Sequence, residues 1–180
     1  MMVSKALIKN QLMTGLAPAE ALTSVNLQLC ENNDTTMFVT VWLAVIDLST
    51  GEGLACNAGH ENTGLRREGG QFELLSYKHN MSVGVSKRAK YVNRPFKLSH
   101  GDSLFVYTDG VPEAHDSNDK MFGLERLETV LNQDSGAMPE RLIGNVRSAL
   151  HDFVQDAPQF DDVTMLALKY FGIDSEKDSL

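Results

Sequence analysis

The sequence predicts an α+β sandwich, in which antiparallel strands form a core that helices cover. Segments with helical periodicity stand before and after one continuous block of strand-like segments, and they do not alternate with strands as βαβ units do. No internal repeat is present. A chain of 180 residues with 42% hydrophobic content is long enough for one well-buried core, so we expect a single domain.

Two helices are expected first. Residues 1–14 carry apolar side chains at helical spacing, although no Ser, Thr, Asp or Asn stands ahead of them as a cap. A second helix is predicted over 18–31, because Pro18 suits the first position of a helix. The linker TGLAP between them is short, which predicts that the helices pack as an antiparallel pair against one sheet.

The middle of the chain is predicted to be β-structure. A hairpin is expected first, and Gly-rich or Ser-rich turns then separate further strands, which predicts a continuing antiparallel meander. Two amphipathic helices and a last strand follow. The expected strands cover 37–48, 54–59, 63–67, 72–76, 91–98, 103–108 and 161–171, and the expected helices cover 123–133 and 138–155.

Composition excludes several classes of partner and compartment. The net charge of -8 and the pI near 5.0 argue against a nucleic-acid partner and fit the binding of cations. Cys30 and Cys56 form no CxxC pattern and are interpreted as core residues of a protein in a reducing compartment. No apolar run is long enough to span a bilayer, and no signal peptide is evident, so we expect no membrane partner and a cytoplasmic location.

Residues 172–180 are polar and predicted to be a flexible tail.

Three carboxylates stand where strands begin or end. Asp109 follows the apolar run LFVYT, and Asp161 and Asp162 precede the last predicted strand. Antiparallel neighbours would bring these ends together, and the carboxylates would then repel each other unless a cation lay between them. Two interpretations are open at this point: solvated turns, for which Asp-Gly is a favoured pair, or a site for a hard divalent cation.

Other candidates for chemistry are weaker. His60 suits an acid, a base or a metal ligand, but a single histidine in a loop is more often a structural hydrogen-bonding group. Ser103 and Thr108 have no evident base, and the absence of GxSxG argues against a Ser-His-Asp hydrolase. The segments GEG and REGGQ match no nucleotide-binding loop and are interpreted as turns.

The order of NAGH, GDSLFVYTDGVPEA, FGLERL and FDDVTMLAL resembles the SpoIIE-type branch of the metal-dependent (PPM-type) serine/threonine protein phosphatases. The resemblance covers residues 1–171 and implies two stacked antiparallel sheets flanked by helices. It also implies two Mn²⁺ or Mg²⁺ ions that activate a water for in-line attack on a phosphoserine or phosphothreonine. On this resemblance, Asp109 and Asp161 are the metal ligands and catalytic residues, with carboxylates roughly 4 to 7 Å apart. Gly110 and Asp162 would support them without binding the ions.

The chain also departs from the family pattern. The GDVSGKG-type loop that supplies further metal carboxylates is not found ahead of the first helix, so we expect an N-terminally truncated domain or a misplaced start. Asn62 stands where the family usually has proline, a change that we do not expect to affect the chemistry. Two carboxylates against the charge of two divalent ions predict at most one weakly held ion and little activity for these 180 residues.

The resemblance implies a phosphorylated bacterial regulatory protein as substrate, of the anti-sigma-factor antagonist type, and an upstream receiver or sensory domain. The alternative is a non-catalytic binding module that keeps the fold, which the missing carboxylates favour. Loss of N-terminal strands would expose sheet edges, and exchange of the first two helices between copies would then give a homodimer.

Overall fold

The computed structural model describes residues 2–31, 37–158 and 161–173 and divides into two compact units. The first unit consists of Met1–His60 and Lys78–Lys97, and the second consists of Glu61–Tyr77 and Leu98–Leu180. Each unit contains one antiparallel sheet and two helices. Residues 174–180 of the predicted tail lie outside the described residues.

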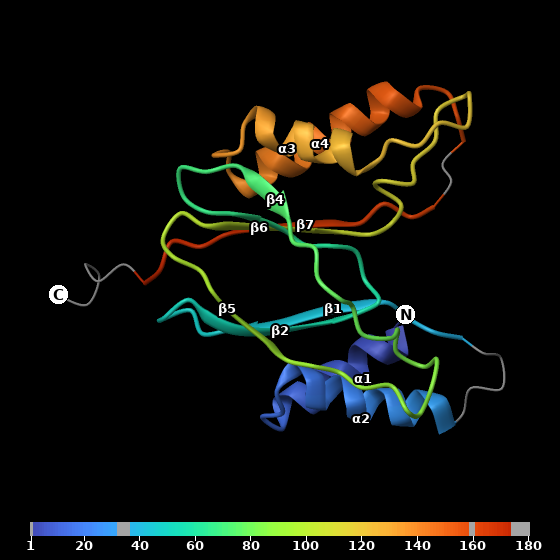
Figure 1. Ribbon diagram of the computed structural model, residues 1–180, viewed down its shortest axis with the longest axis vertical. Helices are drawn as coiled ribbons and strands as arrows, with labels where there is room; N and C mark the ends of the chain where they lie inside the picture. Colours follow the sequence, from blue (N-terminus) through green and yellow to red (C-terminus); the bar gives the residue numbers. More distant parts are fainter. Residues whose placement is uncertain (1, 32–36, 159–160, 174–180) are drawn as a thin grey trace. The chain divides into compact units, whose positions relative to one another are not determined.

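The first unit is a three-stranded sheet with two helices packed beside it (Figure 1). Helix α1 contacts α2, and α2 contacts β1 and β2, so the predicted helix pair is present. The strand order is β1-β2-β5, and both pairings are antiparallel. The elements are α1 (Met2–Met13), α2 (Pro18–Glu31), β1 (Val41–Ile46), β2 (Glu52–Ala58) and β5 (Arg94–Lys97).

The core of the first unit lies between α2 and the sheet. Leu22 and Val25 on α2 are fully buried together with Cys56 and Ala58 on β2, as the helical spacing of the α2 sequence requires. Asn93 fixes the start of α2, because its side-chain oxygen accepts a hydrogen bond from the Ala19 N–H at 2.8 Å.

The second unit is a four-stranded sheet with order β4-β3-β6-β7 and antiparallel pairings throughout. Helix α3 contacts β4, and α4 contacts α3 and β7, so that both helices lie on the same sheet (Figure 1). The elements are β3 (Gly64–Arg66), β4 (Phe72–Leu74), β6 (Ser103–Tyr107), α3 (Leu124–Gln133), α4 (Pro139–Val154) and β7 (Met165–Lys169).

One aromatic and aliphatic cluster forms the core of the second unit. Phe105 and Tyr107 from β6 pack with buried residues of both helices, among them Leu127 of α3 and Leu142 and Val146 of α4. These leucine and valine positions recur at helical spacing, which explains why each helix presents one apolar stripe to the sheet.

The pairing of the strands corrects one prediction. All the expected strands and helices are present within a few residues of their predicted bounds, but the meander was wrong. Strand β5 pairs with β2 in the first unit, and β6 inserts between β3 and β7 in the second. Turn signals mark where strands end, but they do not specify which distant strand becomes the partner.

Two asparagines on helices hold the backbone of neighbouring segments. In the first unit, Asn26 of α2 accepts from the Gly84 N–H at 2.8 Å and donates to the Ser86 carbonyl at 2.9 Å. In the second unit, Asn132 of α3 accepts from the Phe72 N–H at 2.7 Å and donates to its carbonyl at 3.0 Å. Each amide thus satisfies one donor and one acceptor of a chain segment that a helix covers.

Asp102 anchors the turn before β6 within the second unit. Its buried carboxylate accepts hydrogen bonds from the N–H groups of Ser99 and Glu68, both at 2.9 Å, and from Arg67 at 2.6 Å. Burial alone would raise the pKa of Asp102, but these hydrogen bonds and the Arg67 charge outweigh it and hold the pKa below its ordinary value.

Among the helices of the described ranges, none has both the length and the apolar character needed to cross a bilayer.

Candidate functional site

The end of β6 lies beside the start of β7. The two strands are antiparallel, with Tyr107 opposite Met165, and the ladder continues beyond them because the Thr108 N–H donates to the Thr164 carbonyl at 3.0 Å. Asp109 therefore leaves one strand next to the segment that leads into the other. The expectation that antiparallel neighbours bring these acidic positions together is confirmed at the level of the backbone.

The Thr108 hydroxyl joins the two segments a second time. It donates to the carbonyl of Asp162 and accepts from the N–H of Thr164, both at 3.0 Å. A threonine side chain can do both at once because its hydroxyl has one donor and two acceptor positions. Thr108, for which the sequence showed no catalytic base, thus has a structural role, since its hydroxyl links the two acidic segments by hydrogen bonds.

Gly110 allows the acidic segments to meet at backbone distance. A Cβ atom at position 110 would lie 2.6 Å from the carbonyl oxygen of Asp162 and 3.0 Å from its carbonyl carbon, so any side chain there would displace one of the two segments. Gly110 is buried, whereas Asp109 beside it is exposed. The predicted supporting role of Gly110 has a physical basis in this close approach.

Each of the two predicted ligand carboxylates accepts a hydrogen bond from the amide that follows it. The Gly110 N–H donates to Asp109 at 3.1 Å, and the Asp162 N–H donates to Asp161 at 2.6 Å. The Asp109 turn is closed further by the Glu113 N–H, which donates to the Asp109 carbonyl at 2.9 Å. Asp162 enters the arrangement through its backbone, as acceptor for Thr108 and donor to Asp161, and its side chain is exposed.

The residues at this sheet end offer the type of ligand that a divalent cation prefers, but too few of them to complete its coordination. Hard cations such as Mn²⁺ and Mg²⁺ prefer carboxylate oxygens, which Asp109 and Asp161 offer at one end of the sheet. Among the residues that the structure describes, however, no group of three or more His, Cys, Asp or Glu side chains is placed to hold a metal. The described ranges therefore supply part of a cation site, and the predicted carboxylate separation stays a prediction.

The alternative catalytic candidates have structural roles. The His60 N–H donates to Asn57 at 2.8 Å and the Asn57 amide donates to the His60 carbonyl at 3.0 Å, which closes the turn after β2. Cys56, which the sequence predicted to be a core residue, is buried, and that burial raises the pKa of its thiol. Ser103 is buried inside β6, where a substrate could not reach it.

A small cavity beside the acidic segments was not predicted. Gly110 and Asp161 line one side of it, and His115, Leu150 and His151 are among the residues that complete it, for a volume of about 160 Å³. All of them belong to the second unit. No sequence signal pointed to the cavity, because it forms where the end of α4 meets the turn after β6.

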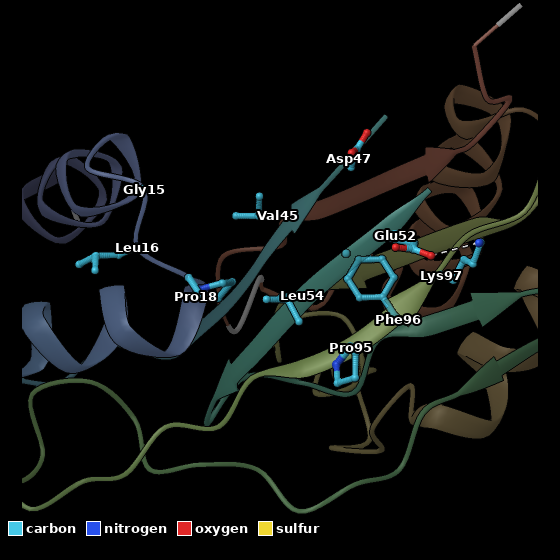
Figure 2. Close-up of a pocket in the computed structure, with 12 residues that line it drawn as sticks. Gly15, Leu16, Pro18, Val45, Asp47, Glu52, Leu54, Pro95, Phe96 and Lys97 are labelled. Carbon is cyan, nitrogen blue, oxygen red and sulfur yellow. Dashed lines mark hydrogen bonds and ion pairs between the residues drawn. The ribbon is translucent and has the colours of Figure 1, made fainter. Parts of the chain in front are cut away.

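A larger groove lies in the first unit, where the linker between α1 and α2 meets β1, β2 and β5 (Figure 2). Its volume is about 750 Å³, and Pro18, Leu54 and Phe96 contribute apolar surface. The ion pair between Lys97 and Glu52, at 3.2 Å, stands at one end of the groove. None of the four predicted site residues lines this groove.

Comparison with known proteins agrees with this fold. The family model of stage II sporulation protein E (SpoIIE) matches residues 1–171. Protein IcfG of Synechocystis sp. is 33% identical over 139 residues, which cover 77% of this chain and 22% of that protein. Phosphoserine phosphatase RsbU of Bacillus subtilis is 26% identical over 159 residues, which cover 87% of this chain and 46% of RsbU. The chain thus spans less than half the length of either relative.

The fold has solved counterparts. The SiaA-PP2C domain of Pseudomonas aeruginosa superposes with a TM-score of 0.80 at 18% identity, covering 94% of this chain and 68% of that one. Two antiparallel sheets and four helices are therefore an α+β arrangement of the PP2C (PPM) phosphatase type, as the sequence predicted. With its family model matched over almost the whole length, the chain belongs to the SpoIIE family.

Proposed function

We propose that this chain is the C-terminal part of a metal-dependent phosphatase domain that hydrolyses phosphoserine or phosphothreonine on a bacterial regulatory protein. The observation that carries the proposal is the backbone contact between the Asp109–Gly110 turn and the Asp161–Asp162 segment. Such a contact would bring the carboxylates that follow β6 and precede β7 to one end of the sheet, where a hard cation would relieve their repulsion. Membership of the SpoIIE family and the likeness to RsbU, itself named a phosphoserine phosphatase, support the proposal.

Asp109 and Asp161 would hold the ion, which would be Mn²⁺ or Mg²⁺. A bound divalent cation supplies Lewis-acid charge for the attack of water on phosphorus and for the charge that develops on the phosphoryl oxygens. The contribution of the chain itself is positional. Gly110 permits the close approach of the two segments, the Thr108 hydroxyl joins them, and the amides of Gly110 and Asp162 orient the two carboxylates.

The substrate that we propose is a phosphorylated anti-sigma-factor antagonist, on the strength of the family likeness. A receiver or other sensory domain in the same protein and a cytoplasmic location belong to the same proposal. A homodimer formed by exchange of α1 and α2 is a further proposal, which sedimentation of the purified chain would test. Two ions are proposed for the complete domain, and at most one weakly held ion for these 180 residues.

A second candidate is a non-catalytic binding module with the same fold. The observation in its favour is that no set of three or more metal-ligating side chains comes together within the described residues. The two candidates differ in a measurable way. A phosphatase domain binds Mn²⁺ through Asp109 and Asp161, whereas a binding module has no need of that affinity.

Titration calorimetry with Mn²⁺ on the unsubstituted chain, Asp109→Asn and Asp161→Asn tests the proposal. We expect weak binding that falls by about tenfold or more in either variant, because each removes one of two charged ligands. Asp119→Asn is the matched control. It makes the same change on an exposed loop of the same unit, at a residue with φ of 59° that asparagine tolerates.

Hydrolysis of p-nitrophenyl phosphate and of a phosphoserine protein completes the test. We expect little turnover from this chain and metal-dependent turnover from a longer gene product that includes any GDVSGKG-type loop encoded upstream. Equal turnover by both, or full activity of Asp109→Asn in the longer protein, would show that the site has been assigned to the wrong residues.

A further inference from the structure

The cavity beside Gly110 and Asp161 adjoins the proposed cation site but has no role in the proposed hydrolysis. It lies in the second unit, between the turn after β6 and the C-terminal end of α4, and both acidic segments contribute to its wall. A phosphate bound to a cation at Asp109 and Asp161 would therefore stand at the edge of this cavity. Chain atoms on either side of the phosphorylated residue would pass over it.

The size of the cavity selects the kind of occupant. Its volume of about 160 Å³ is well below the roughly 300–1,000 Å³ of sites that enclose a small organic ligand. At about 30 Å³ for each water in the liquid, it corresponds to roughly five waters, or to one large aliphatic side chain. A single anchoring side chain of a bound protein is the occupant of matching size.

The lining selects the chemistry of that side chain. Leu150, Val154, Ala157 and Val163 present carbon to the cavity, so the apolar part of its surface exceeds the polar part. Leu150 is nearly buried and belongs to the core cluster, which gives the cavity a fixed floor. An aliphatic side chain would bury its surface here, whereas an aspartate or glutamate would lose water beside the Asp161 carboxylate.

Two histidines border the cavity and give it a polar rim. His115 lies in the turn after β6 and is half-buried, and His151 lies in the last turn of α4 and is exposed. Imidazole groups donate and accept hydrogen bonds, so they suit the peptide backbone of a bound segment. Apart from Asp161, the polar side chains that line the cavity are these two histidines and Gln155, none of which carries negative charge.

From these observations we propose that the cavity is a specificity pocket, which takes one aliphatic side chain of the phosphoprotein at a residue near the phosphorylated serine or threonine. The proposal rests on the proposed phosphatase function, because it places the phosphate at a cation that Asp109 and Asp161 hold. An extended chain advances about 3.3–3.6 Å for each residue, so the anchoring side chain lies within about three residues of the phosphate.

Binding of phosphoserine peptides in the presence of Mn²⁺ tests the pocket without relying on turnover. In a series with a Gly-Ser background, one leucine is moved from three residues before the phosphoserine to three residues after it. Fluorescence anisotropy gives the dissociation constants. We expect one leucine position to tighten binding about tenfold over the leucine-free peptide, and aspartate at that position to remove the gain.

Histidine NMR signals locate the bound leucine. With diamagnetic Mg²⁺ in place of Mn²⁺, the imidazole protons of His115 and His151, assigned from His→Gln variants, are expected to shift with the favoured peptide and to shift less with the leucine-free one. Shifts confined to His60, His79 or His100 would place the leucine elsewhere and would overturn the proposal.

Ala157→Leu fills the pocket, and Ser148→Leu is its control. Both add the same side chain, but Ala157 lines the cavity, whereas Ser148 lies on α4, is exposed and does not line it. We expect Ala157→Leu to abolish the leucine preference and to leave Mn²⁺ affinity unchanged, and Ser148→Leu to change neither. Should Ala157→Leu fail to fold, Val163→Phe, at another lining residue that is partly exposed, gives the same information.

The outcomes separate the pocket from the function on which it depends. Phosphopeptide binding that requires Mn²⁺ and Asp109 but shows no leucine preference would overturn the pocket and leave the phosphatase proposal standing. Leucine preference that survives in Ala157→Leu would also overturn the pocket alone. Absence of any Mn²⁺-dependent phosphopeptide binding would overturn both.

Discussion

The two units share a plan but differ in how deeply their sheets are buried. In the second unit, four of the five residues of the inner strand β6 are buried, whereas in the first unit only three of the seven residues of the inner strand β2 are. The buried apolar cluster of the second unit, which contains four aromatic residues, is also larger than that of the first, which is built from aliphatic side chains and Cys56. Depth of burial limits local opening, so the unit that carries Asp109 and Asp161 should be the more rigid of the two.

The difference in burial suggests that the second unit provides the rigid support that the proposed cation site needs. A cation site requires carboxylates that stay in place, and a deep core under β6 provides that support. The first unit, with its shallower core, has no predicted site residue to hold. Its groove and its half-buried strand β1 predict more frequent local opening than in the second unit.

The strongest way to break the comparison is Phe105→Ala. Phe105 is 0% exposed at the centre of β6, and removal of such a ring costs about 3–5 kcal/mol of unfolding free energy. Urea denaturation followed by circular dichroism measures the loss. Leu22→Ala, at a 0% exposed position of α2, is the counterpart in the first unit. We expect Leu22→Ala to raise the hydrogen-exchange rates of the α2 and β2 amides while the β6 amides stay protected. Equal deprotection of the β6 amides in Leu22→Ala would refute the difference in rigidity.

Asn26→Leu and Asn132→Leu compare the two asparagines. Each change leaves one backbone N–H and one carbonyl without the amide partner, at a cost of about 1–3 kcal/mol for each group that water cannot reach. Asn26 is 1% exposed and Asn132 is only half-buried, so we expect the larger loss at Asn26. Thermal denaturation of both variants decides the order, and a larger loss at Asn132 would contradict it.

Gly110→Ala sharpens the view of the second unit. The added methyl group would meet the Asp162 carbonyl, and we expect a loss of about 1–3 kcal/mol in stability from overpacking. Because the displaced segment carries Asp161, Mn²⁺ affinity should fall by about tenfold as well. Gly144→Ala is the control, since a Cβ there meets nothing and alanine favours a helix. Unchanged Mn²⁺ affinity in Gly110→Ala would mean that the close approach is not needed for the site.

Asp102 gives the second unit a dependence on acid. Its pKa is lowered in the folded state, so its contribution to stability is present above the unfolded pKa of about 3.9 and is lost as the pH falls through the folded value. Urea denaturation between neutral pH and about pH 3 should therefore show a steeper fall for the unsubstituted chain than for Asp102→Asn. Parallel curves would show that other carboxylates dominate the acid response.

Sequence patterns predicted the helices and strands because those depend on local periodicity and turn residues. The final pairing of β5 with β2 could not be predicted in the same way, since the turn signals on both sides of 91–98 are equally consistent with a meander. The approach of the turn at residues 109–110 to the segment 161–162 was predictable, because antiparallel pairing of two strands fixes which ends are neighbours. The cavity was not, because His115 and His151 are brought together only by the packing of α4.

The Thr108 hydroxyl has a consequence for the timing of motions at the end of the sheet. The Thr108 hydroxyl is hydrogen-bonded to both the Asp162 carbonyl and the Thr164 amide. The end of the β6–β7 pairing therefore cannot open unless these two hydrogen bonds break. Separation of the acidic segments and release of this end of the pairing are then a single cooperative opening. Hydrogen exchange at the Thr164 amide would therefore report how often the two acidic segments separate, and we expect that exchange to be faster in Thr108→Val.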